Sequence, residues 1–294
     1  MIHYSNCPNC SSGNISFYLS VKDHSVSGET FDIWQCKACS LKFTQDIPEP
    51  ENIGRYYQSQ DYISHTDTKE GLVNNLYHKV RSFTLGQKRK LVQSKSGMKT
   101  GKILDIGCGT GAFLNEMKDN GWNITGIEQD EATRQRAFQN YKISASTPSA
   151  LFSLTQKFDA ITMWHVLEHV HQLHDYIREC KRLLTDNGVL IIAVPNHTSG
   201  DAEHYKDSWA AWDVPRHLYH FSPESMKALM HLHGFKIEEM KPMWFDSFYV
   251  SMLSEKYSNK GNLPSAFVQG MVSNVKAAAN VKKCSSVIYV LRIN

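Results

Sequence analysis

The chain has 294 residues, enough for one large domain or for a small module joined to a domain of ordinary size. Hydrophobic residues make up 41% and charged residues 21%, a balance typical of a folded globular protein, which excludes a disordered or fibrous one. The net charge of +3 is too small to imply nucleic-acid binding by itself. No apolar run reaches the roughly 18 residues that span a bilayer, and the start, MIHYSNCPNC, lacks the apolar segment of a signal peptide. We therefore expect no membrane partner and a cytoplasmic location.

Four of the seven cysteines form two C-x-x-C pairs near the start of the chain, Cys7 with Cys10 and Cys36 with Cys39. Each pair presents two thiolates from one tight turn, and two pairs complete the tetrahedral shell of a structural Zn²⁺ site. A reducing compartment favours metal binding over disulfides. The spacing predicts a zinc-ribbon-like module over residues 1–48. The alternative is four buried, free cysteines.

Residues 49–98 have a helical pattern, with a tyrosine-rich part that includes Tyr56 and Tyr57, and they are expected to form a connector or cap. From residue 102 onward, strand-like and helix-like segments alternate. Strands are expected at 102–105, 123–127, 158–163 and 189–194, with a weak strand near Ile143, and helices at 112–119, 131–140 and 171–184. This alternation predicts a parallel sheet covered on both faces.

The last part of the chain predicts one further helix and two strands. Ser222 and Pro223 begin a helix that ends at Gly234. A strand is expected at 235–241 and a last one at 286–292, with a helical insertion at about 245–283 between them. Residues 99–294 are thus expected to form one α/β domain.

A glycine loop, LDIGCGTG at residues 104–111, follows the first of these strands. Glycines between a strand and a helix let the backbone approach a ligand closely. The loop also fits the dinucleotide fingerprint G-x-G-x-x-A, but Asp105 stands where a pyrophosphate would lie, and an acid suits a ligand with an ammonium group better. Glu128 ends the next strand, where an acid can accept both hydroxyls of a ribose.

At these residues the chain resembles the class I S-adenosylmethionine-dependent methyltransferases, whose signature is an acid followed by G-x-G-x-G and a second acid after the next strand. The resemblance covers roughly residues 102–241 and implies a Rossmann-like sheet of seven strands, mostly parallel, with an antiparallel last strand. It implies that S-adenosylmethionine is the cosubstrate, that Asp105 holds its amino group, and that Glu128 binds its ribose. The expected cofactor-binding residues are Asp105, Gly107, Cys108, Gly109, Gly111, Glu128, Gln129 and His165.

Residues 165–169 read H-V-L-E-H, the spacing of the inverted zinc-protease motif. A protease needs a helix long enough to present both histidines, and a third ligand, but this stretch directly follows an apolar strand. His165 is therefore expected at the carboxyl end of that strand, where ligands bind in open parallel sheets. The stretch is interpreted as a wall of the cofactor pocket and not as a protease site.

The loop at residues 196–221 should lie over the same edge of the sheet and contains AWDVPRHLYHF. Methyl transfer to oxygen or carbon requires removal of a proton, which suits a histidine. His217 and His220 are the candidate bases, with His165 third. The alternative is a packed lid whose polar groups are satisfied internally.

The expected function is methyl transfer to an oxygen or carbon of a small metabolite or sugar. The segment MWHV at 163–166 replaces the Asn/Asp-Pro-Pro-aromatic segment typical of methylation on base amines, which disfavours that reaction. The alternatives are an RNA methyltransferase that uses the zinc module for binding, a nicotinamide dehydrogenase, and an inactive binding module of the same fold.

Overall fold

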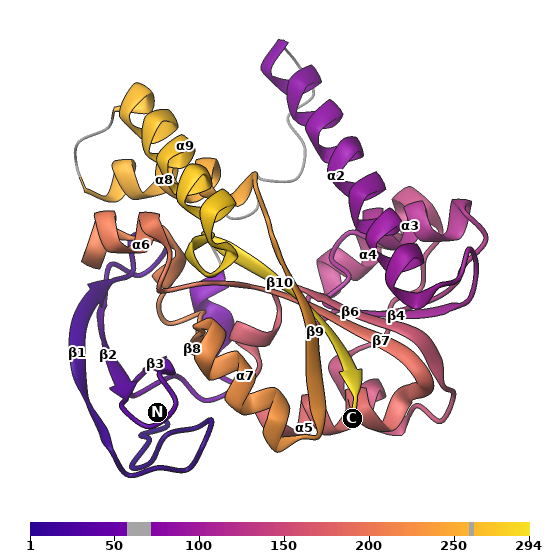
Figure 1. Ribbon diagram of the computed structural model, residues 1–294, viewed down its shortest axis with the longest axis horizontal. Helices are drawn as coiled ribbons and strands as arrows, with labels where there is room; N and C mark the ends of the chain where they lie inside the picture. The colour runs from indigo at the N-terminus through magenta and orange to yellow at the C-terminus, as the bar shows by residue number, and fades with distance from the viewer. Residues whose placement is uncertain (58–71, 259–261) are drawn as a thin grey trace.

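The computed structural model describes residues 1–57, 72–258 and 262–294. These residues form two sheets, a large one in the centre and a smaller one at the N-terminal side (Figure 1). The part of the expected connector at residues 58–71 lies outside the described residues. Its other parts are the short helix η1 (Ile53–Tyr57) and the long helix α2 (Leu72–Ser96), as the helical pattern predicted.

The central sheet has the strand order β5-β4-β6-β7-β10-β9. The first four run parallel, whereas β10 is antiparallel to both of its neighbours. Since β4 and β6 meet where the chain order changes direction, the carboxyl ends of these strands form the edge at which ligands bind in such sheets. The strands are β4 (Lys102–Ile106), β5 (Asn123–Ile127), β6 (Phe158–Trp164), β7 (Leu184–Pro195), β9 (Phe235–Pro242) and β10 (Ser286–Ile293).

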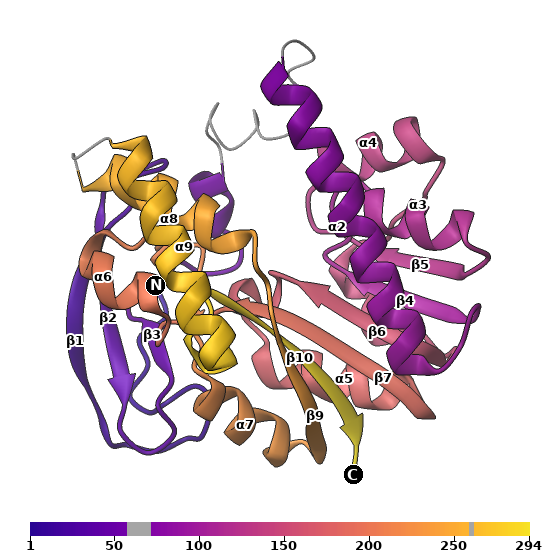
Figure 2. The ribbon, with the colours of Figure 1, turned by 45° about the horizontal axis from the view of Figure 1, so that its top comes forward.

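Helices cover both faces of this sheet (Figure 2). One face is covered by α2, α3 (Ala112–Asp119) and α4 (Glu131–Tyr141), which pack on a hydrophobic cluster that includes Ile103 and Ile191. On the other face α5 (Leu173–Leu183) and α7 (Pro223–Leu232) pack on a cluster that includes Leu104 and Ile192. Successive side chains of a strand point to opposite faces of the sheet, so neighbouring residues of one strand contribute to the two different hydrophobic cores.

The expected α/β fold is present, with one difference in the strand count. The weak strand predicted near Ile143 is reduced to a bridge between Ile127 and Ser146, so the sheet has six strands. Next along the chain is the short helix η3 (Pro148–Ser153), which begins with a proline that has no N–H to donate. The helical insertion consists of α8 (Asp246–Tyr257) and α9 (Leu263–Ala279), between β9 and β10.

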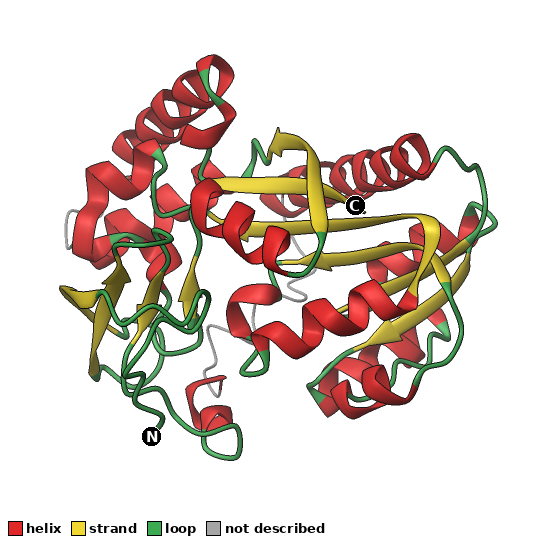
Figure 3. Cartoon of the chain, turned by 60° about the horizontal axis from the view of Figure 1, so that its bottom comes forward, coloured by secondary structure: helices red, strands yellow, loops and turns green. Residues whose placement is uncertain are grey.

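The N-terminal sheet is antiparallel and contains β1 (Ile15–Lys22), β2 (Thr30–Cys36) and β3 (Lys42–Thr44). Its fourth strand, β8 (Tyr219–His220), comes from the loop after β7 and pairs with β3. Figure 3 shows the strands of this smaller sheet above the N-terminus, beside the larger sheet. The same loop carries α6 (Gly200–Tyr205), η5 (Lys206–Ser208) and η6 (Ala210–Trp212). The N-terminal segment therefore supports the loop that was expected to cover the ligand-binding edge.

Among the described residues, no helix combines the length and the apolar composition that crossing a bilayer would require.

Candidate active site

The glycine loop leaves β4 with three residues in the left-handed region, Gly107, Gly109 and Gly111, at φ of 72°, 54° and 80°. A Cβ atom on Gly107 would lie 2.3 Å from Cγ2 of Val166, so a side chain there would also clash with the segment after β6. The N–H groups of Gly107 and Cys108 donate to the carbonyl of Ile127, at 2.7 and 2.9 Å. The loop is therefore fixed against the end of β5, where Glu128 follows.

Asp105, on β4 just before this loop, is 2% exposed and accepts a hydrogen bond of 2.6 Å from the hydroxyl of Thr162 on β6. Burial raises the pKa of Asp105 to about 7, although Thr162 and the charge of Lys88 act in the opposite direction. Lys88 reaches this region from α2, with its Nζ 4.3 Å from the ring centroid of Trp164. The buried carboxyl of Asp105 could therefore form an ion pair with a cationic group of a ligand.

Glu128 is held by two backbone N–H groups. Its Oε2 accepts from Gly109 at 2.9 Å and its Oε1 accepts from Asp130 at 3.0 Å. Asp130 caps α4 by accepting from the N–H of Thr133, whereas Gln129 is exposed and contributes its carbonyl to Arg134. Cys108 is buried with its sulfur facing Gly126, and burial raises the pKa of its thiol. Of the expected cofactor-binding residues, Asp105, the three glycines, Cys108 and Glu128 thus meet at one point.

His165 follows β6 directly, in the left-handed region with φ of 57°. Its Nε2 lies 2.9 Å from a carboxylate oxygen of Asp246 on α8, and its Nδ1 lies 3.4 Å from Oε1 of Glu168. Burial alone would lower the pKa of this histidine, but the two carboxylates outweigh burial and raise the pKa to about 10. The two carboxylates therefore favour the protonated form of His165.

The short helix η4 (Leu167–His169) brings a second histidine and a carboxylate to the loop after β7. The rings of His169 and His217 are edge to face, with centroids 4.6 Å apart. One ligand atom from each of Glu168, His169 and His217 lies within 4.8 Å of the other two. We call these three residues the Glu–His cluster.

His220 lies deeper, 3% exposed, with its ring centroid 6.5 Å from that of His217. The hydroxyl of Thr44 on β3 donates to the carbonyl of His217 at 2.7 Å, so it accepts from Nε2 of His220 at 3.2 Å. Burial lowers the pKa of His220 well below its usual value. His217 and His220 are thus close neighbours, but they differ in exposure and in hydrogen bonding.

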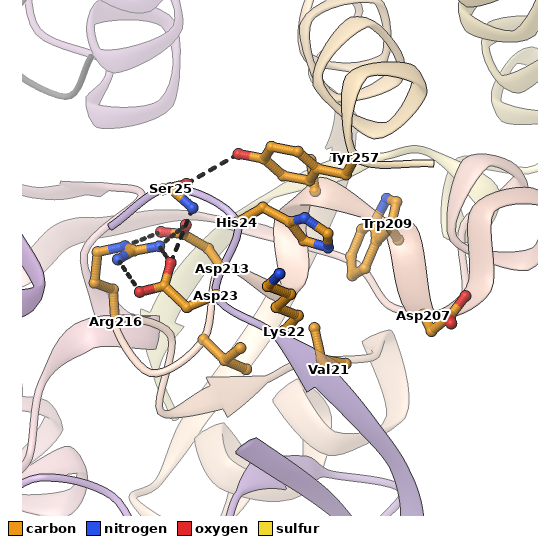
Figure 4. A pocket seen from close by; sticks show the side chains of 12 residues that line it. Val21, Lys22, Asp23, His24, Ser25, Asp207, Trp209, Asp213, Arg216 and Tyr257 are labelled. Atoms are coloured by element: carbon orange, nitrogen blue, oxygen red, sulfur yellow. Dashed lines mark hydrogen bonds and ion pairs between the residues drawn. The ribbon is translucent and has the colours of Figure 1, made fainter. Parts of the chain in front are cut away.

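The loop is also held by a buried ion-pair network beside the N-terminal sheet (Figure 4). The guanidinium of Arg216, 1% exposed, contacts Asp23 at 2.9 Å and Asp213 at 2.7 Å, and donates to the carbonyl of Tyr56 at 2.8 Å. The pKa values of both carboxyl groups are lowered because the guanidinium offsets the effect of burial. Asp23 lies beyond β1, so this contact joins the N-terminal segment to the residue before His217.

The four cysteines Cys7, Cys10, Cys36 and Cys39 converge, with all ligand atoms within 4.8 Å of one another. The sulfur pairs Cys7–Cys39 and Cys10–Cys36 are each 3.6 Å apart, which is too long for disulfides. Sulfurs around a tetrahedral Zn²⁺ with bonds of about 2.3 Å would be about 3.8 Å apart. The convergence of the four sulfurs and these two distances fit a closed metal site; we call the four cysteines the thiol cluster.

A family described as "Methyltransferase domain" matches residues 78–240, which include the glycine loop, Glu128 and the Glu–His cluster. The chain belongs to this family of methyltransferases. The N-terminal cysteine segment lies outside the matched residues.

Curated relatives of this methyltransferase carry the name ubiquinone biosynthesis O-methyltransferase. The protein from Glaesserella parasuis is 36% identical over 110 residues, which are 33% of this chain and 47% of the relative. The protein from Pasteurella multocida is 33% identical over 125 residues, 37% of this chain and 52% of the relative. The methyltransferase thus spans about half the length of the curated relatives that it matches.

Solved structures support the fold. Magnesium protoporphyrin IX methyltransferase from Synechocystis, with bound S-adenosylhomocysteine, is 14% identical, with a TM-score of 0.53 over 82% of this chain and 99% of that chain. A putative sarcosine dimethylglycine methyltransferase from Galdieria sulphuraria is also 14% identical, with a TM-score of 0.50 over 70% of this chain and 85% of that chain. The chain thus shares the fold of these two methyltransferases.

Sequence reasoning missed three residues that shape the site: Lys88, Asp246 and Asp23. Each lies on a segment that had been expected to be a connector, an insertion or a separate module. No local pattern marks them, because each reaches the site only through the tertiary fold.

Proposed function

We propose that this methyltransferase transfers the methyl group of S-adenosylmethionine to a hydroxyl oxygen of a small molecule. Two lines of support favour oxygen and a small acceptor. The curated relatives are named O-methyltransferases, and the loop over the carboxyl edge of the sheet presents histidines and tryptophans in a protein of modest net charge. A nucleic-acid substrate would favour a stronger positive charge.

In this proposal Asp105 on β4 and Glu128 after β5 orient the cofactor. Asp105 pairs with the ammonium of the methionine portion, and Glu128, held by the N–H groups of Gly109 and Asp130, accepts hydrogen bonds from the ribose hydroxyls. The fixed glycine loop lets the backbone approach the methionine chain. The cofactor's methyl group would then face the segment that follows β6, where His165 lies.

The transfer is an in-line displacement. The acceptor oxygen attacks the methyl carbon, the carbon–sulfur bond breaks, and its electron pair stays on sulfur, which becomes a neutral thioether. The protein mainly supplies alignment and excludes water. The acceptor's proton must also leave, and His217 is the best placed of the three candidate bases. Its Nδ1 donates to the carbonyl of Ala211 at 2.8 Å, so the free lone pair is on Nε2.

His165 and His220 serve less well as bases in this proposal. His165, with a pKa of about 10, already carries a proton between Asp246 and Glu168. His220 donates from Nε2 to Thr44 and is enclosed by Trp212, with ring centroids 4.9 Å apart. We assign His165 to positioning and His220 to the attachment of the loop.

We further propose that the thiol cluster holds a structural Zn²⁺. Four thiolates leave no open coordination position, so such a metal would take no part in the transfer. Its role would be to hold β2 and β3, and through β3 the strand β8 of the loop.

The observation that carries the proposal is the convergence of Asp105, the glycine loop and Glu128 beside a histidine-bearing loop. It is tested by calorimetry with S-adenosylmethionine, followed by a screen for S-adenosylhomocysteine release with phenols, catechols and sugars as acceptors. We expect binding, and turnover with at least one hydroxyl acceptor. Failure to bind the cofactor in the folded protein, or turnover only with amine or RNA acceptors, would overturn it.

A further inference from the structure

The helix α9 carries large apolar side chains on the side that faces solvent. It packs on α8 and α6 through small residues, which include Ala266, Gly270 and Ser273. A Cβ atom on Gly270 would lie 2.7 Å from a ring carbon of Phe248 on α8, so these two helices are already in close contact. A surface helix normally turns its polar residues to solvent and its large apolar residues to the core. In α9 the large apolar residues lie on the outside instead (Figure 2).

Six residues form this solvent-facing surface, which we call the apolar α9 face. They are Leu263, Phe267, Val268, Met271, Val272 and Val275, and each is at least 40% exposed. Residues four apart lie on the same side of a helix, so the six form two adjacent rows on one side of α9. Single exposed apolar residues are common on soluble proteins, but a contiguous group marks an interaction surface.

The apolar surface continues onto α8 and is large enough for a stable interface. The rings of Phe248 and Phe267 are stacked, with centroids 5.3 Å apart. Met252 lies one helical turn after Phe248 and is 42% exposed. At these exposed fractions, the apolar α9 face and Met252 leave on the order of 700 Å² in contact with water, more than the largest patch of a typical monomer, about 300–600 Å². Each partner in an interface of standard size buries about 800 Å².

The charges around this surface favour a second copy of the chain over a lipid membrane. Lys276 is the one charged residue within α9, so an α9 face can meet its own copy without a row of like charges. A membrane of anionic lipids attracts lysines that lack a carboxylate partner. Here Lys276 lies 3.9 Å from Glu203, and Lys282 lies 3.0 Å from Glu224. An uncharged face is also complementary to itself, as the twofold axis of a dimer requires.

The helix α9 belongs to the insertion that reaches the active site. α8 begins at Asp246, whose carboxylate lies 2.9 Å from Nε2 of His165. Ser273 of α9 donates to Asp201 of α6, in the loop after β7. A partner bound to α9 would therefore rest on the two helices that contact the residue after β6 and the loop after β7.

We propose that the apolar α9 face pairs with the same face of a second copy, so that this methyltransferase is a homodimer with its two α9 helices at the twofold axis. Pairing removes the exposed side chains of both copies from water, which is the main favourable contribution to association. The two faces together would bury about 1,400 Å², within the range of about 1,200–2,000 Å² that is typical of specific, stable interfaces.

Size-exclusion chromatography with multi-angle light scattering tests the pairing. Wild type at high micromolar concentration should have twice the 33.5 kDa mass of one chain. Val268→Glu should raise the dissociation constant of the dimer at least about tenfold, because two carboxylates would then be buried in the interface. The matched control is Leu232→Glu, which introduces the same charge at a comparably exposed apolar position on α7 and should leave the dimer intact. A monomeric wild type, or a dimer of wild-type affinity in Val268→Glu, would overturn the proposal.

Two further measurements keep the result interpretable. Circular dichroism establishes that Val268→Glu is folded; if it is not, hydrogen exchange on dilute and concentrated wild type decides, because the amides of α9 should exchange more slowly in the dimer. Equal exchange rates throughout α9 would overturn the pairing. A wild type that stays monomeric but sediments with vesicles of phosphatidylcholine and phosphatidylglycerol would also overturn it and assign the face to a membrane. None of these measurements uses an acceptor, so the dimer and the proposed O-methylation stand or fall separately.

Discussion

The thiol cluster and the Glu–His cluster both bring potential metal ligands together, but they are built differently. The thiol cluster comes from two C-x-x-C turns within the first 40 residues, and its sulfurs already have nearly the spacing of a zinc site. The Glu–His cluster joins η4 to a residue in the loop after the next strand. The thiol cluster is thus assembled from nearby segments of the chain, whereas the Glu–His cluster depends on the tertiary structure.

The two clusters are also connected. β3 follows Cys39 and pairs with β8, and Thr44 on β3 holds the carbonyl of His217. The first cluster thus supports the loop that carries part of the second. Disrupting the thiol cluster should therefore disturb the loop, whereas changes at the other cluster should leave the thiol cluster intact.

Replacing a ligand of the thiol cluster should have the largest effect. Cys36→Ser is expected to lose bound Zn²⁺ and to lower the free energy of unfolding by more than about 3 kcal/mol, because structural zinc contributes directly to folding. Methyl transfer should be lost as well, since β8 loses its support. Zinc content, denaturant unfolding and turnover measure this. Cys180→Ser is the control, because it places the same hydroxyl in a fully buried position away from the cluster; equal effects of the two substitutions would contradict a metal role.

Breaking the ion-pair network between the regions should have the next largest effect. Arg216→Ala leaves Asp23 and Asp213 without their buried cation, and removing one partner of a buried pair typically costs about 3–5 kcal/mol. Unfolding in denaturant checks this, with bound Zn²⁺ expected to remain. Arg178→Ala, which removes an exposed pair with Asp175, should cost about 1 kcal/mol or less. Similar losses for both arginines would show that Arg216 does not support the loop.

Asp105→Asn should weaken S-adenosylmethionine binding by about 10- to 100-fold, because a hydrogen bond to a charged group contributes about 1.5–3 kcal/mol. Calorimetry measures the affinity, and zinc content should stay at the wild-type value. Asp119→Asn, at the exposed end of α3, is the matched control and should bind normally. Wild-type affinity in Asp105→Asn would remove this residue from the cofactor site.

The smallest effect concerns pH. The pKa of Asp105 is raised to about 7 by burial, and the ionised form is the one that pairs with the ammonium. Acidification below pH 7 protonates it, so cofactor affinity should fall by up to about tenfold per pH unit. The pKa of Asp105 is higher in the folded protein than in the unfolded chain. In the ligand-free protein, its contribution to the free energy of unfolding is therefore fully present below pH 4 and is lost as the pH rises through 7. Calorimetry between pH 5.5 and 7 should show that cofactor affinity falls with acidification in wild type and stays constant in Asp105→Asn.

The sequence was most informative where structure is local. The helix at residues 112–119 and the strand at 123–127 have the expected bounds, because glycines and apolar periodicity mark them. The cysteine pairs were likewise evident from spacing. The strand near Ile143 was not fully formed, since a weak apolar stretch alone does not determine pairing.

Long-range contacts were beyond sequence reasoning. H-V-L-E-H at 165–169 was interpreted as a pocket wall, but its surroundings depend on Asp246, far along the chain, and on the exact placement of His217. Whether a histidine is a cation, a base or a ligand depends on those neighbours. A single sequence does not specify these distances.

The pairing of β3 with β8 also constrains how the chain can be made. Residues 42–44 leave the ribosome long before Tyr219 and His220, so the N-terminal sheet first exists with an open edge at β3. An unpaired edge is a template for pairing with other chains. When β8 pairs with β3, it fixes the loop after β7 and covers the open edge of the nascent sheet. One short strand therefore completes the loop and protects the sheet from aggregation in a single event during biosynthesis.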